Sequence, residues 1–365
     1  MKLPSTRKEL IRQLREKYPC QYRMYLKFED VRIELQTNSE PLLEELQDYF
    51  GQFNSDPADS DIIITAHQAP EPRLDYEYIL KEPDSGKKVF KEEYEDFPDG
   101  RIVRKRITGM IFVFGGSQNL AIGPCTRNPN QVINFINNRY IDWQLRRGCI
   151  LGHAAAVTFN GRGLAIAGNS GMGKSTLALH VVSMGASFVS NDRLLVEKTG
   201  EKLTMHGVAK LPRINPGTAL NNPFLKDIVP EKDMILFEHY SKEDLWDLEH
   251  KYDVFIDKCF GEDRFKLNAP MDGLLILNWK RGNGSPKLKR LDVEKRSASL
   301  SAFIKSPGLF YFPEKGKPEA DLSLQNYKEF LSRCDVFEIE GGLDFERATD
   351  ICLDYLSSKK VPALK

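Results

Sequence analysis

The feature that most constrains the fold is a glycine-rich octapeptide, residues 168–175, which reads GNSGMGKS. It fits the phosphate-binding pattern G-x-x-x-x-G-K-[ST], in which glycines let main-chain N–H groups approach phosphate oxygens, the lysine adds a positive charge and the final hydroxyl can bind Mg²⁺. The flanks agree with this interpretation. Residues 163–167 (GLAIA) predict a short buried strand, and residues 176–183 (TLALHVVS) predict a helix whose N-terminus favours an anion. A strand, loop and helix in this order predict a nucleotide-binding α/β domain.

The bulk composition argues against several classes of protein. The 365-residue chain is long enough for two domains, and its 52 basic and 52 acidic residues cancel, so no global attraction to nucleic acid or to an anionic membrane is expected. The six cysteines are scattered without metal-ligand spacing, which is typical of a reduced cytosolic protein with unpaired thiols. The charged N-terminal segment lacks the apolar core of a signal peptide, and no apolar run reaches the roughly 18 residues of a membrane helix. We therefore expect a cytoplasmic protein.

Residues 1–125 predict an N-terminal mixed α+β domain. Helical patterns occur at residues 5–17 and 41–50, and strand patterns occur at 31–36 and 62–65. Further stretches predict antiparallel strands with turns at 98–100 and 115–116; they are residues 87–95, 101–107 and 109–115. No motif in this block indicates chemistry, so a docking role and a structural role both stay open.

Residues 126–365 predict a second domain, which contains the phosphate loop. A helix is expected at residues 128–147, where apolar residues recur at helical spacing. Residues 154–159 and 163–167 predict two strands that are joined by Asn160-Gly161, a favoured hairpin turn. The strand before the loop thus gains an antiparallel partner, which predicts a mixed sheet and not the purely parallel sheet of most proteins with this loop.

Four further sites carry candidate functional residues. His153 precedes the hairpin and could face a terminal phosphate, or could bond to nearby backbone. Asp192 ends an apolar strand and could orient Mg²⁺ or take a proton from an attacking hydroxyl, or could cap a turn. Lys210 and Arg213 lie in a proline-rich loop and could clamp phosphates or an acidic substrate, or could belong to a plain connection. Asp272 precedes its apolar run, which is the wrong end for holding Mg²⁺, and we interpret it as structural.

Together these residues resemble the catalytic domain of HPr kinase/phosphorylase, a bacterial serine kinase whose fold is related to that of phosphoenolpyruvate (PEP) carboxykinase. The resemblance runs from about Gly152 to Trp279 and keeps His153, the loop and Asp192 in register without a gap. Several segments are similar to the group called HPr-kinase-related kinase B; they are residues 211–218, 252–258, 267–270 and 305–308. The resemblance implies an α/β fold, in which the N-terminal α+β domain precedes a PEP carboxykinase-like P-loop kinase domain with a mixed sheet.

The resemblance also implies a role for each matching residue. Lys174 and Ser175 would bind the phosphates and Mg²⁺, and Lys174 would take part in catalysis. Asp192 would be the catalytic carboxylate and a metal ligand, with His153 supporting it. ATP would lie on nine residues of the loop and the helix start: Gly168, Asn169, Ser170, Gly171, Met172, Gly173, Lys174, Ser175 and Thr176.

Two departures from the family pattern lie in the same region. The family has two adjacent aspartates, and the first of these positions is Asn191 here. Where the family has a metal-binding glutamate before an Arg-Gly-Leu-Gly stretch, this chain has residues 204–207 (TMHG), and Glu197 or Glu201 is the candidate replacement. We therefore predict kinase activity and not the family's reverse reaction.

The favoured hypothesis is an ATP- and Mg²⁺-dependent kinase that transfers the γ-phosphoryl group to a serine or threonine hydroxyl of a protein partner. One alternative is a nucleotide-binding regulatory protein without phosphotransfer, which Asn191 and Thr204 motivate. Another is a kinase of a small-molecule phosphoacceptor. Neither nucleic acid nor a membrane is expected as a partner. The relatives form hexamers, and a homo-oligomer is left open for this chain.

Overall fold

The computed structural model describes residues 3–83, 88–237, 239–241, 244–245, 248, 250–280, 282, 284–313, 316 and 319–358. The chain forms two compact units. Unit 1 contains residues 1–147 together with Pro307–Ala320, and unit 2 contains Gly148–Ser306 and the chain from Asp321 onward. The sequence predicted that the first domain ends at residue 125. The structure keeps the next helix, α3 (Pro129–Arg146), with unit 1, because its apolar side chains pack on the sheet of that unit.

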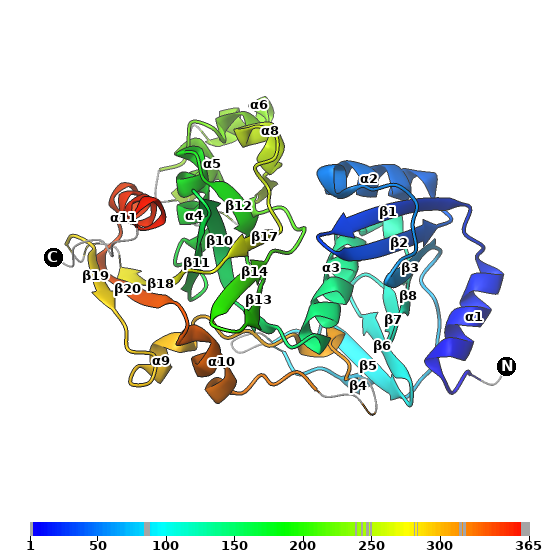
Figure 1. Ribbon diagram of the computed structural model, residues 1–365. Coiled ribbons are helices and arrows are strands. Elements are labelled where there is room, and N and C mark those ends of the chain that lie inside the picture. The colour runs from blue at the N-terminus through cyan, green and yellow to red at the C-terminus, as the bar shows by residue number, and fades with distance from the viewer. Residues whose placement is uncertain are drawn as a thin grey trace. The chain divides into compact units, whose positions relative to one another are not determined.

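Unit 1 is built on one eight-stranded sheet in the order β1-β2-β3-β8-β7-β6-β5-β4. β3 pairs in parallel with β2 and β8, and the other neighbours are antiparallel. On β7, Ile111 and Val113 pack towards α1, whereas Phe112 and Phe114 pack on α3. Figure 1 shows these two helices on opposite sides of the sheet. The elements are α1 (Arg7–Lys17), β1 (Tyr22–Phe28), β2 (Val31–Thr37), α2 (Glu40–Phe50), β3 (Ile62–Gln68), β4 (Ile79–Leu80), β5 (Glu92–Phe97), β6 (Gly100–Lys105), β7 (Ile111–Phe114) and β8 (Gln118–Gly123).

Most helices and strands predicted for this unit are confirmed, with small shifts at their ends; the strand expected at 87–95 is confirmed only in part, and β1, β4 and β8 were not predicted. Thr6 and Ser39 begin α1 and α2 by accepting main-chain N–H groups of the first turn. Gly115 and Gly116 form the predicted turn, and both have positive φ. The expected strand at 87–95 corresponds to β5, which begins at Glu92, and its first residue lies outside the described part of the chain.

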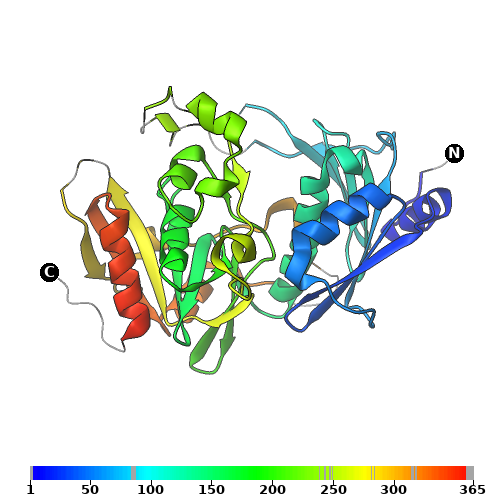
Figure 2. The same ribbon diagram turned by 90° about the horizontal axis from the view of Figure 1, so that it is seen from above.

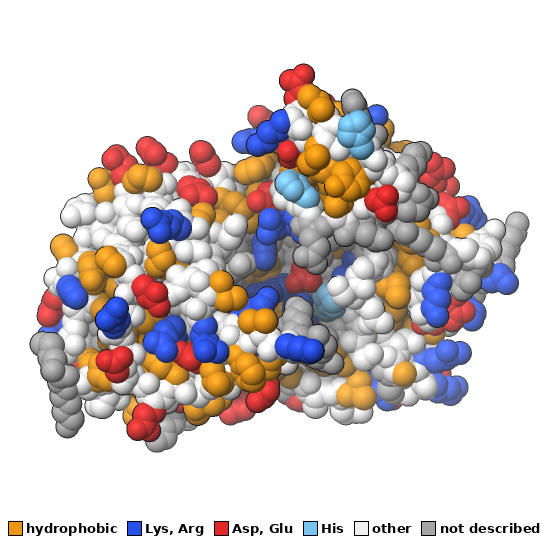
Figure 3. Space-filling model, turned by 180° about the vertical axis from the view of Figure 1, so that it is seen from behind, with side chains coloured by type: hydrophobic (Ala, Val, Ile, Leu, Met, Phe, Trp, Pro, Cys, Tyr) orange, Lys and Arg blue, Asp and Glu red, His pale blue; other side chains and the backbone are white. Residues whose placement is uncertain are grey.

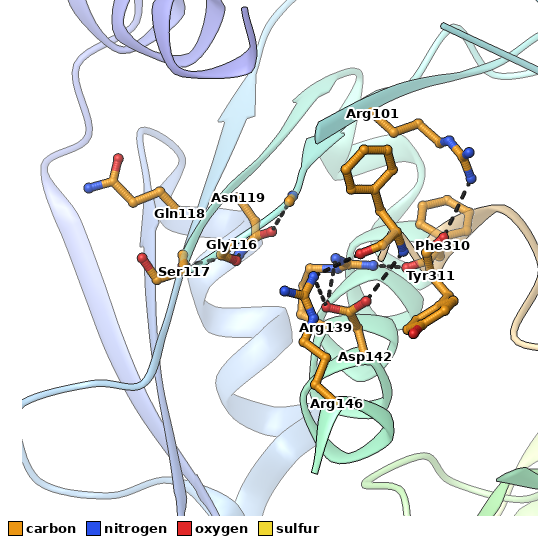
Figure 4. A network of polar contacts seen from close by, with 12 residues as sticks. Arg101, Gly116, Ser117, Gln118, Asn119, Arg139, Asp142, Arg146, Phe310 and Tyr311 are labelled. Carbon is orange, nitrogen blue, oxygen red and sulfur yellow. Dashed lines mark hydrogen bonds and ion pairs between the residues drawn. The ribbon is translucent and has the colours of Figure 1, made fainter. Parts of the chain in front are cut away.

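A segment from late in the chain completes unit 1 through a buried arginine. Arg139 of α3 is 2% exposed; its guanidinium donates to the carbonyl of Phe310 and lies 4.2 Å from the centre of the Phe114 ring. Asp142 pairs with Arg139 at 3.7 Å and with Arg146 at 2.9 Å (Figure 4). Burial lowers the pKa of Arg139 to about 10, so the group is still charged at neutral pH. This network ties residues 307–320 to α3.

Unit 2 contains a mixed six-stranded sheet in the order β12-β10-β11-β18-β20-β19. β11 pairs antiparallel with β10 and in parallel with β18, which confirms the predicted mixed sheet. The hairpin turn places Asn160 at φ 52° and Gly161 at φ 74°, as this two-residue turn requires. The strands are β10 (Ala154–Phe159), β11 (Arg162–Gly168), β12 (Ser187–Ser190), β18 (Gly273–Lys280), β19 (Lys287–Arg290) and β20 (Asp335–Gly342).

Helices cover one face of this sheet, and a second sheet covers the other. α4 and α11 lie side by side on one face (Figures 1 and 2). An apolar core that includes Ala165 and Ala167 separates the other face from the four-stranded sheet β17-β14-β13-β9. These and the smaller elements are α4 (Lys174–Ser183), α5 (Pro216–Leu220), α6 (Glu231–Phe237), α8 (Ile256–Phe260), α9 (Ser297–Leu300), α10 (Leu324–Leu331), α11 (Phe345–Ser357), β9 (Ile150–Gly152), β13 (Leu194–Thr199), β14 (Lys202–His206), β15 (Arg213–Ile214), β16 (Tyr252–Asp253) and β17 (Asn268–Pro270).

The surface mixes charges of both signs. Figure 3 shows lysine and arginine side chains interspersed with acidic ones, as the equal numbers of 52 basic and 52 acidic residues lead one to expect. Hydrophobic side chains are exposed at the top of that view, where α6 presents Met234, Ile235 and Leu236. All six cysteines carry free thiols. Within the described ranges, no helix combines the length and the apolar character that crossing a bilayer demands.

Candidate active site

The predicted phosphate loop connects β11 to α4. Gly171 and Gly173 have φ of 81° and 83°, a left-handed conformation that glycine adopts without the steric cost of a Cβ. A Cβ on Gly173 would also lie 2.7 Å from the Phe345 ring, so this position lacks room for a side chain. The loop delivers the chain into α4 at Lys174, and the first N–H groups of that helix have no helical acceptors. This is the arrangement that binds phosphate at a helix N-terminus.

Lys174 is folded back onto the loop. Its ammonium donates to Gly168 O at 2.8 Å and to Asn169 O at 3.3 Å, and the residue is 8% exposed. Burial lowers the pKa of this ammonium; the charge of Asp192 opposes the shift and that of Lys305 adds to it. Both acceptors are neutral carbonyls, so an anionic phosphate oxygen would be the stronger partner.

Side chains from distant parts of the sequence, all within unit 2, support the loop. Trp279, near the end of β18, donates from Nε1 to Met172 O at 3.0 Å. The Trp279 ring packs edge-on against Phe345 of α11 at 5.3 Å, and Phe345 stacks on His180 of α4 at 5.7 Å. Only the tip of the loop, at Asn169, Ser170 and Gly171, is exposed. The aromatic side chains therefore support the loop on the side that faces the sheet, and the tip of the loop is exposed on the other side. Sequence reasoning missed this aromatic support.

Asp192 lies just beyond β12 and is held by two side chains from other segments. His153 Nε2 lies 3.1 Å from Oδ1, and Lys305 Nζ lies 3.0 Å from Oδ2. Burial alone would raise the pKa of this carboxyl, but the hydrogen bond with His153 and the charge of Lys305 hold its pKa well below the usual range. The carboxylate is therefore ionised at neutral pH, and its side chain is 47% exposed, so another group can approach it.

Two main-chain hydrogen bonds hold the segment that carries Lys305 against the segment that carries His153, so both side chains reach Asp192. Lys305 N donates to Leu151 O at 3.2 Å, and His153 N donates to Phe303 O at 2.5 Å. A Cβ on Gly152 would lie 2.4 Å from the buried Phe303 ring, so glycine allows the two segments to meet this closely. Sequence reasoning gave Lys305 no role, because it lies 113 positions from Asp192; the signal that could have found it was the motif at residues 305–308.

Three side-chain oxygens, at the start of α4 and just beyond β12, are of the kind that binds Mg²⁺. The Ser175 hydroxyl at the start of α4 makes no hydrogen bond with the described residues, and Asn191 Oδ1 is buried without a partner among them. Asp192 supplies a carboxylate. Within the described part of the chain, three or more His, Cys, Asp or Glu side chains do not converge on a metal site. Such a sparse set suits Mg²⁺, which protein sites hold through one or two carboxylates, substrate phosphates and water.

The candidate replacement glutamates do not reach this position. Glu197 on β13 lies opposite Thr204 on β14 and pairs with His206 Nε2 at 3.1 Å. β13 starts beside Gly152 and leads away from His153 and Asp192, and Glu197 lies about 10 Å along this strand from Leu194. Glu201 lies in the turn at the far end of that hairpin. The interpretation that either glutamate replaces the family's metal ligand is therefore not supported by the geometry.

Two other predicted residues have their side chains occupied. The Thr176 hydroxyl lies 3.0 Å from that of Thr218, which leaves the Thr176 main-chain N–H for a nucleotide. Asp272 accepts the N–H of Gly163 at 2.9 Å. It directly precedes β18, and the parallel pairing of β18 with β11 puts it at the end of the sheet opposite the loop. This agrees with the structural role assigned to Asp272 from the sequence.

Comparisons with known proteins give little similarity. Neither the protein-family models nor the curated proteins include a match to this chain. Among solved structures, the chain is similar to the HPr(Ser) kinase/phosphatase from Coxiella burnetii, with 13% identity, a TM-score of 0.28, and coverage of 57% of this chain and 87% of that one. This similarity is too low to carry an argument, so the function is argued from the site itself.

Proposed function

We propose that this protein is an ATP-dependent kinase of the HPr-kinase type, which transfers the γ-phosphoryl group to a serine or threonine hydroxyl of a protein partner. One observation carries the proposal. An ionised carboxylate, Asp192, is bonded to His153 and Lys305 within electrostatic reach of Lys174 on a phosphate loop. A carboxylate at this position can both hold Mg²⁺ and accept the hydrogen bond of an acceptor hydroxyl, which is what phosphoryl transfer requires.

The reaction follows from these groups. The main-chain N–H groups at the start of α4 and the Lys174 ammonium bind the phosphates of ATP. Mg²⁺, held by Ser175 and Asp192, would neutralise phosphate charge when bound. The acceptor oxygen forms a bond to the γ-phosphorus while the bond from that phosphorus to the β–γ bridging oxygen breaks, and ADP leaves. Asp192 accepts the hydrogen bond of the acceptor hydroxyl and takes its proton.

A carboxylate with a strongly lowered pKa is a weak base. In a loose phosphoryl-transfer transition state the nucleophile carries little new charge, so its proton can leave late. Asp192 therefore contributes mainly by orienting the hydroxyl towards the γ-phosphorus. His153 and Lys305 keep it in place by bonding its two oxygens.

Asp192→Asn tests this proposal. We expect the variant to transfer label from γ-labelled ATP about 10²- to 10⁴-fold more slowly, because an amide is a poorer acceptor for the hydroxyl and a poorer Mg²⁺ ligand than a carboxylate. MgATP binding should weaken far less, because the loop still binds the phosphates. The measurement is label incorporation into protein acceptors, beside direct nucleotide titration of both proteins. An unchanged transfer rate contradicts the assigned role.

A nucleotide-binding regulatory protein is the second candidate, because Asn191 stands where the resemblance implies a carboxylate. It predicts that the unaltered protein binds ATP tightly and labels no acceptor. Metabolite fractions tested as acceptors separate the third alternative, a small-molecule kinase, from the protein kinase.

Lys305→Met should shift the pH dependence of transfer. Lys305 is a positioning residue whose charge lowers the pKa of Asp192, so its removal raises that pKa towards the ordinary value of about 3.9. Because Asp192 acts when ionised, the variant should lose activity at a higher pH than the unaltered protein as the solution is acidified. We would compare kcat/KM from about pH 3 to pH 8, with the half-exposed Lys266→Met as the matched control. If kcat/KM fell at the same acidic pH in Lys305→Met and in the unaltered protein, Lys305 would have no role in setting the pKa of Asp192.

A further inference from the structure

The segment 207–218 is anchored to both parts of the candidate site. At its start, a Cβ on Gly207 would lie 2.1 Å from the Val189 carbonyl oxygen, so the chain packs directly on the end of β12. At its end, Thr218 Oγ1 lies 3.0 Å from Thr176 Oγ1 on α4. The segment therefore connects the strand that leads to the carboxylate with the helix that follows the phosphate loop.

The middle of this segment is also fixed. Val254 N donates to Pro212 O at 2.9 Å, and Arg213 pairs with Asp253 at 3.3 Å where β15 meets β16. The charge of Arg213 is thus satisfied by a neighbouring carboxylate. Of the two residues that the sequence suggested as a clamp for phosphates or an acidic substrate, only Lys210 therefore stays a candidate.

The Lys210 side chain differs from that of Arg213 in having no partner among the described residues. Its ammonium makes no hydrogen bond or ion pair with the residues that the structure describes. The charged groups around it are Arg193, Asp192, Arg213 and Asp253, and burial together with the two arginines lowers its pKa to about 8 against the opposing carboxylates. A half-buried cation without a partner costs stability unless a ligand satisfies it.

The other lysines around Asp192 already have partners. Lys174 bonds to the loop carbonyls, where phosphates of a nucleotide would bind, and Lys305 bonds to the carboxylate itself. Lys210 stands on a different segment from the loop, and the charge of Asp192 acts on it, so Lys210 is the candidate for binding the molecule that approaches Asp192.

We infer that Lys210 binds an oxyanion of the phosphoacceptor, a phosphate or carboxylate group close to the hydroxyl that is phosphorylated. A neutral acceptor would leave the Lys210 ammonium unsatisfied, whereas an oxyanion gives it a charge-assisted hydrogen bond. The substrate class is therefore a hydroxyl with an acidic neighbour, on a protein or on a metabolite. The inference rests on the proposed function for the position of the hydroxyl, although the anion site itself can be tested without phosphoryl transfer.

The test uses the full-length protein with lysines labelled by reductive ¹³C-methylation and followed by NMR. Lys210→Arg and Lys174→Arg identify the two signals. Inorganic phosphate is the probe, added to the unaltered protein, to Lys174→Ala and to the protein saturated with MgADP. We expect phosphate to raise the pKa of Lys210 in all three samples, and Lys210→Gln to weaken phosphate binding in the Lys174→Ala background about tenfold, the loss of one charge-assisted bond.

Each outcome has a defined meaning. The inference is overturned if the NMR signal of Lys210 does not change when phosphate is added. It is also overturned if Lys174→Ala abolishes phosphate binding entirely. A Lys210 signal that moves fully with a non-hydrolysable MgATP analogue, and no further with phosphate, assigns the ammonium to the nucleotide and also overturns it. If the Lys174 signal does not change with nucleotide while the Lys210 signal still responds to phosphate, the proposed kinase function is wrong but the anion site at Lys210 is supported.

Transfer assays then separate the two sources of the oxyanion. γ-labelled ATP is incubated with a small hydroxy acid such as glycerate, or with fractionated protein. With either acceptor, Lys210→Gln should raise the acceptor KM about tenfold and leave the KM for ATP unchanged. An acceptor KM that does not respond to this variant would refute the inference.

Discussion

Lys174→Ala should reduce phosphoryl transfer about 10²- to 10³-fold, the usual cost of removing one group that stabilises transition-state charge. The variant loses the ammonium that now bonds to Gly168 O and Asn169 O and that would bind the outer phosphates. MgATP affinity should fall as well, because a charge-assisted bond contributes about 1.5–3 kcal/mol. Nucleotide titration and label transfer measure the two effects separately.

Lys202→Ala is the matched control, since Lys202 is an exposed lysine of the same unit in the β13–β14 hairpin. It should change neither quantity. If Lys174→Ala and Lys202→Ala behaved alike, the loop would not be a phosphate site, and the proposed kinase would have no basis.

Arg139→Ala should destabilise unit 1 by about 3–5 kcal/mol, which is typical when one partner of a buried ion pair is removed. The change leaves Asp142 in the interior with Arg146 as its remaining ion-pair partner and takes the donor from the Phe310 carbonyl. It also empties the space beside the Phe114 ring. Urea unfolding followed by circular dichroism measures the loss.

The control for this change is Arg12→Ala. Arg12 forms an ion pair with Glu16 on the surface of α1, where both side chains are 64% exposed. Such pairs contribute about 0–1 kcal/mol, so the control should stay close to the unaltered protein. Equal midpoints for the two variants would show that the buried network does not stabilise the unit.

Local patterns predicted much of the fold. Asn160-Gly161 closes the hairpin because both residues accept positive φ, and the glycines of the phosphate loop adopt conformations that their sequence spacing anticipated. The same patterns placed His153 and Asp192 at the ends of neighbouring elements, and the structure brings these side chains to 3.1 Å. Their roles, like those of Ser175 and the rest of the loop, stay predictions until tested.

Contacts over long sequence separations could not be predicted. Lys305 reaches Asp192, and Trp279 reaches Met172, through pairings that neither periodicity nor turn residues encode. The membership of residues 307–320 in unit 1 was missed for the same reason, because the pattern of that segment resembles a surface loop. The buried Arg139 bonds to this segment, and a contact over 171 positions leaves no mark in the local pattern.

The return of residues 307–320 to unit 1 has a consequence for synthesis on the ribosome. The carbonyl that Arg139 requires is made about 160 residues after unit 1 has otherwise been translated, since that unit breaks at Arg147 and resumes at Pro307. At about 5–20 residues per second, this delay is roughly 10–30 seconds. During that interval the nascent chain holds a guanidinium without its acceptor, so the N-terminal half cannot reach its final state before unit 2 has largely emerged.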